Sequence, residues 1–314
     1  LTLVGGGAAI VEQMKGSSAV NAGGLSGELT VNIADDGRLT QVSVVTPSGR
    51  TTINAFDARD HVSVDATRLS DGTKLVLTGR VEKIAVNHLA AELDAHALAI
   101  GQLEIQTAAS GGTDQALMIR TGVGETIIAS NAGDTIIVDA EALADGARLT
   151  TSGGGAFQIT NLSGDLFNTA TGAVTATLDH DPAAATVLST RIDSSTAVTV
   201  NNGALDGNDT IVLTGAGAFT VRDLVASVDA SAATGRLDIQ TGAPTGAART
   251  VSIQTGAGES NVASNANDTI IVDAEALADG TRLSTSGAGS FQITNLSGDL
   301  FNTATGAVTA TLDH

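Results

Sequence analysis

The residues with the clearest chemical potential are aspartates that precede short apolar runs. Residues 207–211 read Gly-Asn-Asp-Thr-Ile, which matches once the core of the calcium-binding nonapeptide G-G-x-G-x-D-x-U-x. In such turns, carboxylate and carbonyl oxygens hold a hard cation. Weaker echoes, reading Asp-Thr-Ile, begin at positions 134 and 268. The calcium candidates are therefore Asp206 and Asp209, the best single pair, together with Asp134 and Asp268.

A second interpretation gives the same aspartates a structural role. Nonapeptide sites need consecutive copies, so that two turns share each ion, and the tandem glycines are missing here. Asp and Asn also cap turns by accepting hydrogen bonds from nearby backbone amides. We expect turn caps at these positions, with bound calcium as the alternative and as the one cofactor that the sequence suggests.

A more regular acidic pattern, Asp-x5-Asp-Gly, begins at Asp65, Asp139 and Asp273. If one repeat unit makes three turns of about 24 residues, copies of an aspartate lie about 14 Å apart on a stack of strands. That separation is too large for two carboxylates to share an ion, and it exceeds the Debye length at physiological salt. We expect these aspartates to be solvated turn residues.

Catalytic patterns are weak in this sequence. There is no cysteine, no G-x-S-x-G elbow and no P-loop, and no two histidines have the spacing of a metal-binding pair. The acidic residues recur in near-identical copies, whereas a catalytic site is normally unique. We expect no enzymatic activity; the alternative is a β-helix enzyme that acts on acidic polysaccharide with paired carboxylates. The five histidines, expected at the surface or in turns, are His61, His88, His96, His180 and His314.

All these residues belong to an internal repeat. Residues 134–180 recur at 268–314 with four changes in 47 positions, and phrases related to Gly-x-Leu-x-Ile return about every 70 residues. We therefore expect a window on a longer array. Its parts are the end of a preceding unit (1–26), two units (27–100 and 101–171), a shortened unit (172–234), a further unit (235–305) and the start of the next (306–314).

Short runs of β-branched residues, bounded by Gly, Asn, Asp or Ser, indicate strands. In the unit 235–305 we expect strands at 236–241, 251–255, 268–272, 281–285 and 291–294. Residues 89–100 have a faint helical period, so a strand or a short helical turn is expected there. The predicted fold is all-β, a parallel β-solenoid of tandem units of about 70 residues. The alternative is a string of small antiparallel β-sandwich domains.

Composition agrees with a thin aliphatic core. The 314 residues include 37 glycines and six phenylalanines but no Trp, Tyr or Cys. The formal charge of −19 argues against nucleic acid as a partner, because phosphate contacts need clustered Lys and Arg. Three lysines are too few for a polybasic membrane patch. No apolar run reaches 18 residues, so we expect no membrane insertion.

The units, with their phrases DTIIVDAxxLADGxxL and GAGxFxxxxL, resemble the repeat arrays of giant bacterial surface proteins. These include type I-secreted adhesins of the RTX class and related surface-layer or biofilm-matrix proteins. The resemblance implies an extracellular or cell-surface location and a role as a stalk or a self-assembling filament or layer. It implies copies of the chain itself, and cell-surface or matrix polysaccharide, as partners. Rows of Thr and Asn leave a carbohydrate-binding or ice-binding surface as a further alternative.

Overall fold

The computed structural model describes residues 1–35, 37–99, 101–109, 116–179, 188–243, 248–265 and 267–312. The regular elements of these residues are β-strands, numbered β1 to β31. The chain divides into two compact units. The first unit comprises residues 1–160 and 170–172, and the second comprises residues 161–169 and 173–314.

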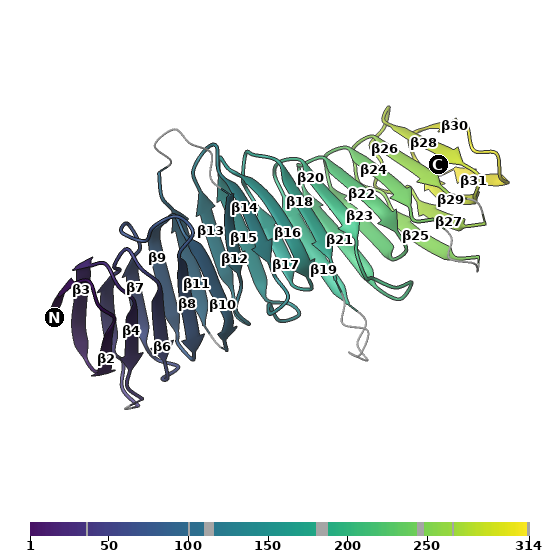
Figure 1. Cartoon of the computed structure of the whole chain (residues 1–314). Coiled ribbons are helices and arrows are strands. Elements are labelled where there is room, and N and C mark those ends of the chain that lie inside the picture. The colour runs from purple at the N-terminus through teal and green to yellow at the C-terminus, as the bar shows by residue number, and fades with distance from the viewer. Residues whose placement is uncertain are drawn as a thin grey trace. The chain divides into compact units, whose positions relative to one another are not determined.

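In the first unit, odd-numbered and even-numbered strands form two separate sheets (Figure 1). The odd-numbered strands are β1 (Thr2–Gly5), β3 (Ser17–Leu25), β5 (Gln41–Val45), β7 (His61–Asp65), β9 (Lys83–Leu89), β11 (Gln102–Thr107), β13 (Thr126–Ser130) and β15 (Arg148–Gly153). The even-numbered strands are β2 (Ala9–Met14), β4 (Leu29–Ile33), β6 (Thr51–Ala55), β8 (Lys74–Gly79), β10 (Glu92–Leu98), β12 (Ala116–Arg120), β14 (Thr135–Asp139) and β16 (Ala156–Leu162).

The second unit is built in the same way. Its odd-numbered strands are β17 (Asp165–Asn168), β19 (Ser189–Ser194), β21 (Thr210–Gly215), β23 (Ser227–Ala233), β25 (Thr250–Gln254), β27 (Thr269–Asp273), β29 (Ser290–Leu296) and β31 (Val308–Leu312). Its even-numbered strands are β18 (Val174–Leu178), β20 (Val198–Asn202), β22 (Phe219–Leu224), β24 (Leu237–Thr241), β26 (Ser260–Ser264), β28 (Arg282–Gly287) and β30 (Asp299–Asn302).

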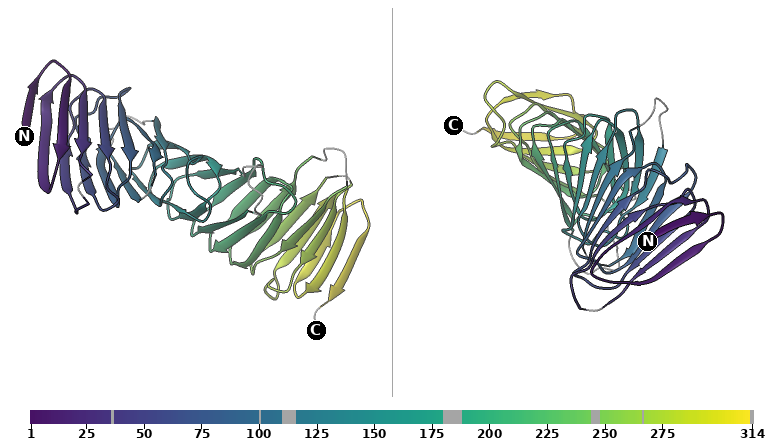
Figure 2. Two further views of the ribbon diagram at one scale, coloured as in Figure 1. Left: turned by 90° about the horizontal axis from the view of Figure 1, so that it is seen from below. Right: turned by 90° about the vertical axis from the view of Figure 1, so that its left-hand side faces the viewer.

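Each turn of the chain contributes one strand to each sheet, and every recorded pairing is parallel. Leu29 pairs with Thr51, 22 positions later, and Thr51 pairs with Leu75, 24 positions later. In the right-hand view of Figure 2, the N-terminal turns, drawn in purple, are flattened loops with a strand on either side. The predicted parallel β-solenoid is therefore confirmed, and the alternative of antiparallel sandwiches is wrong.

The core lies between the two sheets of each unit and is thin and aliphatic. In β4, for example, Leu29, Val31 and Ile33 are buried while the residues between them are partly exposed. Burying one such side chain contributes about 1.5–3 kcal/mol, whereas ordering each backbone residue costs about 1–2 kcal/mol. A single turn is therefore marginal alone, and stacking on its neighbours stabilises it.

The sequence repeat does not match a whole number of turns. The strands β14 and β27 both read TIIVD and lie 134 residues apart, yet one is even-numbered and the other odd-numbered. A full unit spans seven strands, or three and a half turns, as from β4 to β11. The expectation of three turns per unit, and with it the 14 Å spacing, is therefore wrong. Both sheets bury one strand face and expose the other, so half a turn is the building block.

Corner residues mark the phase of the repeat. Gly79 ends β8 with a φ of 96°, and a Cβ atom there would lie 1.9 Å from the carbonyl oxygen of Ala55. Gly153 and Gly287 end β15 and β28 in the same way, with φ of 95° and 94°. Only glycine fits such a corner, because it needs both the left-handed backbone and the absence of a side chain.

The expected strands of the unit 235–305 are confirmed as β24, β25, β27, β28 and β29, with bounds shifted by one to three residues. The strand Ser260–Ser264 was not predicted, since its sequence SNVAS contains one large apolar residue. Residues 89–98 are extended, in the end of β9 and in β10, rather than helical. Within the described part of the chain, no helix has the length and apolar character needed to cross a membrane.

Candidate functional site

Three of the four calcium candidates lie at buried corners of the solenoid. Asp134, Asp209 and Asp268 each directly precede a strand, and each is 1–2% exposed. Asp206 is exposed and shares one turn with Asp209. The sequence therefore placed Asp206 and Asp209 together correctly, whereas Asp134 and Asp268 lie at separate corners, before β14 and β27.

The carboxylates of Asp206 and Asp209 accept hydrogen bonds from backbone amides. Asp209 accepts at Oδ1 from the amide of Leu188, at 2.9 Å, and at Oδ2 from the amide of Asp206, at 2.8 Å. Asp206 accepts at Oδ1 from the amide of Asn208, at 2.7 Å. Both residues therefore act as turn caps, the first of the two roles considered for them.

The corners of Asp134 and Asp268 share one hydrogen bond and differ in a second partner. Thr107 donates its hydroxyl to Asp134 at 3.1 Å, and the equivalent Thr241 donates to Asp268 at 2.9 Å. At the second corner, Arg249 also reaches both carboxylate oxygens, with Nε 3.2 Å from Oδ1 and Nη2 3.1 Å from Oδ2. A guanidinium ion therefore neutralises the buried charge of Asp268.

The described residues contain no group of three or more His, Cys, Asp or Glu side chains that could hold a metal ion. Calcium at Asp206, Asp209, Asp134 and Asp268 stays a prediction. In the Asp-x5-Asp-Gly pattern, the first aspartate caps a turn, as Asp65 does for the amide of Thr67 at 3.1 Å. The second aspartate of each copy is exposed, as expected for solvated turn residues: Asp71, Asp145 and Asp279.

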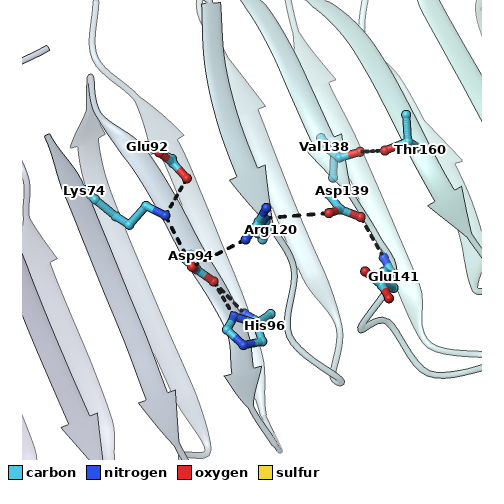
Figure 3. Close-up of polar contacts among 9 residues, drawn as sticks. All are labelled: Lys74, Glu92, Asp94, His96, Arg120, Val138, Asp139, Glu141 and Thr160. Atoms are coloured by element: carbon cyan, nitrogen blue, oxygen red, sulfur yellow. Dashed lines mark hydrogen bonds and ion pairs between the residues drawn. The ribbon is translucent and has the colours of Figure 1, made fainter. Parts of the chain in front are cut away.

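A charged row on the even-numbered sheet of the first unit was not predicted. Asp94, Arg120, Asp139 and Thr160 occupy one register position on β10, β12, β14 and β16. We call these four residues the Asp94 column (Figure 3). Because neighbouring strands lie about 4.8 Å apart, the column alternates negative and positive charge along the stack.

Asp94 is held in place by the next residues of its own strand. The pairing of β10 with β8 shifts register between Asp94 and Ala97, and this bulge brings His96 back toward Asp94. The Nδ1 atom of His96 lies 2.6 Å from Oδ1 of Asp94, and the His96 amide donates to the same oxygen at 3.4 Å. The His96 ring is 64% exposed whereas the Asp94 side chain is 11% exposed, so a buried carboxylate orients an accessible imidazole.

Two basic side chains flank Asp94 from neighbouring strands. Lys74 Nζ lies 2.7 Å from Oε1 of Glu92 and 3.5 Å from Oδ2 of Asp94. Arg120 lies between two carboxylates, 3.9 Å from Asp94 and 3.8 Å from Asp139. Burial by itself raises the pKa of Asp94, but the hydrogen bonds from His96 and the charges of His96 and Lys74 outweigh it and hold the pKa below its ordinary value.

A hollow of about 350 Å³ lies beside the Asp94 column, lined by His96, Arg120, Thr121, Asp139, Glu141 and Ala142. It presents an imidazole, a guanidinium and two carboxylates to solvent. Such a set can hydrogen-bond to sugar hydroxyls, and an imidazole backed by a carboxylate can transfer a proton. The hollow is the one place among the described residues where the sequence brings a histidine and an arginine together in a cavity.

The second unit contains a counterpart of this site, the Asp229 column, formed by Asp229, Gln254, Asp273 and Thr294 on β23, β25, β27 and β29. Its hollow measures about 390 Å³ and is lined by Ser231, Gln254, Thr255, Asp273, Glu275 and Ala276. The same repeat position therefore carries His96 and Arg120 in one unit and Ser231 and Gln254 in the other.

Sequence reasoning missed the Asp94 column because its members are 26 and 19 positions apart, and those intervals depend on loop lengths. The bias toward one-sided acidic strand ends was the available signal. Of the other histidines, His61 lies 3.4 Å from Glu82 and His88 lies 3.4 Å from Asp65, both partly exposed as expected. His180 and His314 lie outside the described residues.

No family model, curated protein or solved structure matches this chain.

Proposed function

We propose that this chain is a non-enzymatic repeat scaffold of the bacterial cell surface or biofilm matrix. Its stacked turns serve as a stalk or assemble into a filament or layer. The supporting observation is the placement of the near-identical segments 134–180 and 268–314. One copy supplies even-numbered strands where the other supplies odd-numbered strands, as β14 and β27 illustrate.

This placement suits a scaffold better than an enzyme. A surface feature encoded once in the repeat is presented by strands of either parity, so the chain gains several equivalent contact positions. Multiple weak contacts add up to strong attachment when they engage together. The formal charge of −19 keeps separate molecules soluble and makes their association sensitive to salt and divalent cations. The partners that fit this proposal are copies of the chain and surface or matrix polysaccharide.

Electron microscopy of the full 314-residue chain, with calcium, with magnesium and with a chelator, tests this proposal. Ordered fibres or sheets support an assembling filament or layer, and separate particles that adhere to polysaccharide support a stalk. Particles that neither associate nor adhere to surface or matrix polysaccharide in any of the three conditions would contradict the scaffold.

A second candidate function rests on the hollow beside the Asp94 column. The 2.6 Å contact between His96 and Asp94 provides an oriented imidazole, which favours a β-helix enzyme that cleaves acidic polysaccharide. Incubation with such polymers, followed by assay for new reducing ends or unsaturated products, tests this candidate. Turnover that is lost in His96→Ala and kept in the matched Ser231→Ala variant would replace the scaffold proposal.

A further inference from the structure

One corner of the first unit contains three buried oxygen atoms without hydrogen-bond partners. They are Oγ1 of Thr40, Oδ2 of Asp57 and Oδ2 of Asp60. Thr40 and Asp60 are 0% exposed and Asp57 is 8% exposed. A buried polar atom without a partner costs about 1–3 kcal/mol, so a group that satisfies all three at once would be strongly favoured.

The three residues converge because two turns stack. Thr40 precedes β5 and Asp60 precedes β7, and these strands are neighbours. The amide of Thr40 donates to Oδ1 of Asp60 at 3.1 Å, and the amide of His61 donates to the carbonyl oxygen of Thr40 at 2.9 Å. Asp57 accepts at Oδ1 from the amide of Arg59 at 3.0 Å. The backbone therefore uses one oxygen of each carboxylate and leaves the other.

No basic side chain is recorded in an ion pair with either carboxylate among the described residues. Arg59 donates instead to the carbonyl oxygen of Gly37, at 2.7 Å, and Lys83 pairs with Glu104 at 2.6 Å. Burial raises the pKa of Asp60, and the charge of Asp57 raises it further, against the hydrogen bond from the Thr40 amide. The corner therefore concentrates negative charge that needs a counter-charge.

The same corner elsewhere in the chain shows how a cation fits. Arg249 precedes β25 as Thr40 precedes β5, and Asp268 precedes β27 as Asp60 precedes β7. There the Arg249 guanidinium bonds both oxygens of Asp268 and also the carbonyl oxygen of Gly242. At the first corner the shorter Thr40 stands at the arginine position, and a second carboxylate, Asp57, joins Asp60.

We propose that Asp57, Asp60 and Thr40 bind one hard divalent cation, with calcium as the preferred ion, between the turn 34–40 and the turn 56–60. Two carboxylates neutralise a doubly charged ion, and oxygen ligands with water as the remainder are those that calcium takes. The ion does for this corner what Arg249 does for the corner of Asp268. It is a different site from Asp206 and Asp209, and it does not depend on the proposed scaffold function.

Calorimetric titration of the calcium-free full chain with calcium, and separately with magnesium, tests the proposal. Asp57→Asn and Asp60→Asn are each expected to remove one bound calcium ion per chain and the rise in thermal midpoint that it produces. The matched control is Asp71→Asn in an exposed turn, which is expected to bind as the parent does. Unchanged calcium binding in both corner variants would overturn the proposal.

Thr40→Arg keeps the test informative where an Asp→Asn variant fails to fold. This substitution copies Arg249 and supplies the positive charge within the chain, so the variant is expected to fold without calcium and to lose one calcium ion. Thr40→Val, which removes only the hydroxyl, is expected to weaken calcium binding about tenfold, a loss of about 1.4 kcal/mol. A parent chain that binds no calcium, and that Asp60→Asn stabilises, would show that the two carboxyls share a proton instead.

Discussion

The Asp94 column and the Asp229 column occupy the same position in two copies of the repeat, yet their charge differs. Both contain two aspartates separated by one residue position along the stack, and both end in a threonine. Between the aspartates stands Arg120 in one column and Gln254 in the other. His96 in the first corresponds to Ser231 in the second.

What the columns share is explained by the backbone. Asp94 accepts from the amide of His96 at 3.4 Å, and Asp229 accepts from the amide of Ser231 at 3.0 Å. Thr160 and Thr294 each donate to the carbonyl oxygen of a valine on the neighbouring strand. The turn caps are therefore required for the fold, whereas the basic residues of the Asp94 column are additions that the fold does not need.

The largest effect is expected from removing the first aspartate of each column. Asp94→Ala deletes the bulge cap and the carboxylate that Lys74 and His96 contact, so we expect the first unit to lose about 2–3 kcal/mol of stability. Asp229→Ala deletes an exposed cap, so the second unit is expected to lose at most about 1 kcal/mol. Urea denaturation, with hydrogen exchange to assign the loss to each unit, measures the difference.

Equal losses in the two variants would contradict this comparison, because they would mean that the basic neighbours of Asp94 contribute nothing to its role. The matched control is Asp145→Ala, since Asp145 is exposed in a turn and its removal is expected to change stability by less than about 0.5 kcal/mol.

Much of the fold could be predicted from the sequence because the signals were local. Alternation of apolar and polar residues in runs such as TIIVD marks a strand wherever it occurs, and the low aromatic content restricts the core to thin layers. The number of strands per repeat was less accessible. The run SNVAS at Ser260–Ser264 is too polar to identify alone, and missing such strands turned three and a half turns into three.

The candidate sites were less predictable, for a physical reason. Which residues meet across strands depends on loop lengths and bulges, and Asp94 meets Arg120 only because β10 carries a register shift after Asp94. The aspartates before strands were recognised as important, but their role as caps or as ligands depends on neighbours from other turns. Thr40, which stands beside Asp60, is an example that no local motif indicates.

Acid should act on the first column through Asp94. The pKa of this carboxyl lies below its ordinary value in the fold, so its ionisation stabilises the folded state above the unfolded pKa, and that contribution is lost as the pH falls through the folded pKa. The stability difference between the parent and Asp94→Asn is therefore expected to be constant near neutrality and to shrink in acid below about pH 4. A difference that grows on acidification would contradict the sign of this shift.

Exchanging the central residues of the columns should have a smaller effect. Arg120→Gln gives the first column the composition of the second, and we expect a loss of about 0.5–1 kcal/mol, because Arg120 is 41% exposed and its ion pairs are long. Gln254→Arg is expected to gain no more than the same amount. Denaturation at low and high salt separates the causes, since an ionic contribution fades above physiological ionic strength and lost packing does not.

The smallest change in stability is expected from His96→Ser. In the second column, Ser231 donates both its amide and its hydroxyl to Asp229, at 3.0 and 2.6 Å, so serine can replace the hydrogen bonds that His96 makes to Asp94. We expect urea denaturation near pH 7 to show a difference below about 0.5 kcal/mol. A larger loss would make the histidine part of the fold. A neutral result would separate His96 from the caps that both columns need and leave the hollow, where its exposed ring faces solvent beside Arg120, as the place where it acts.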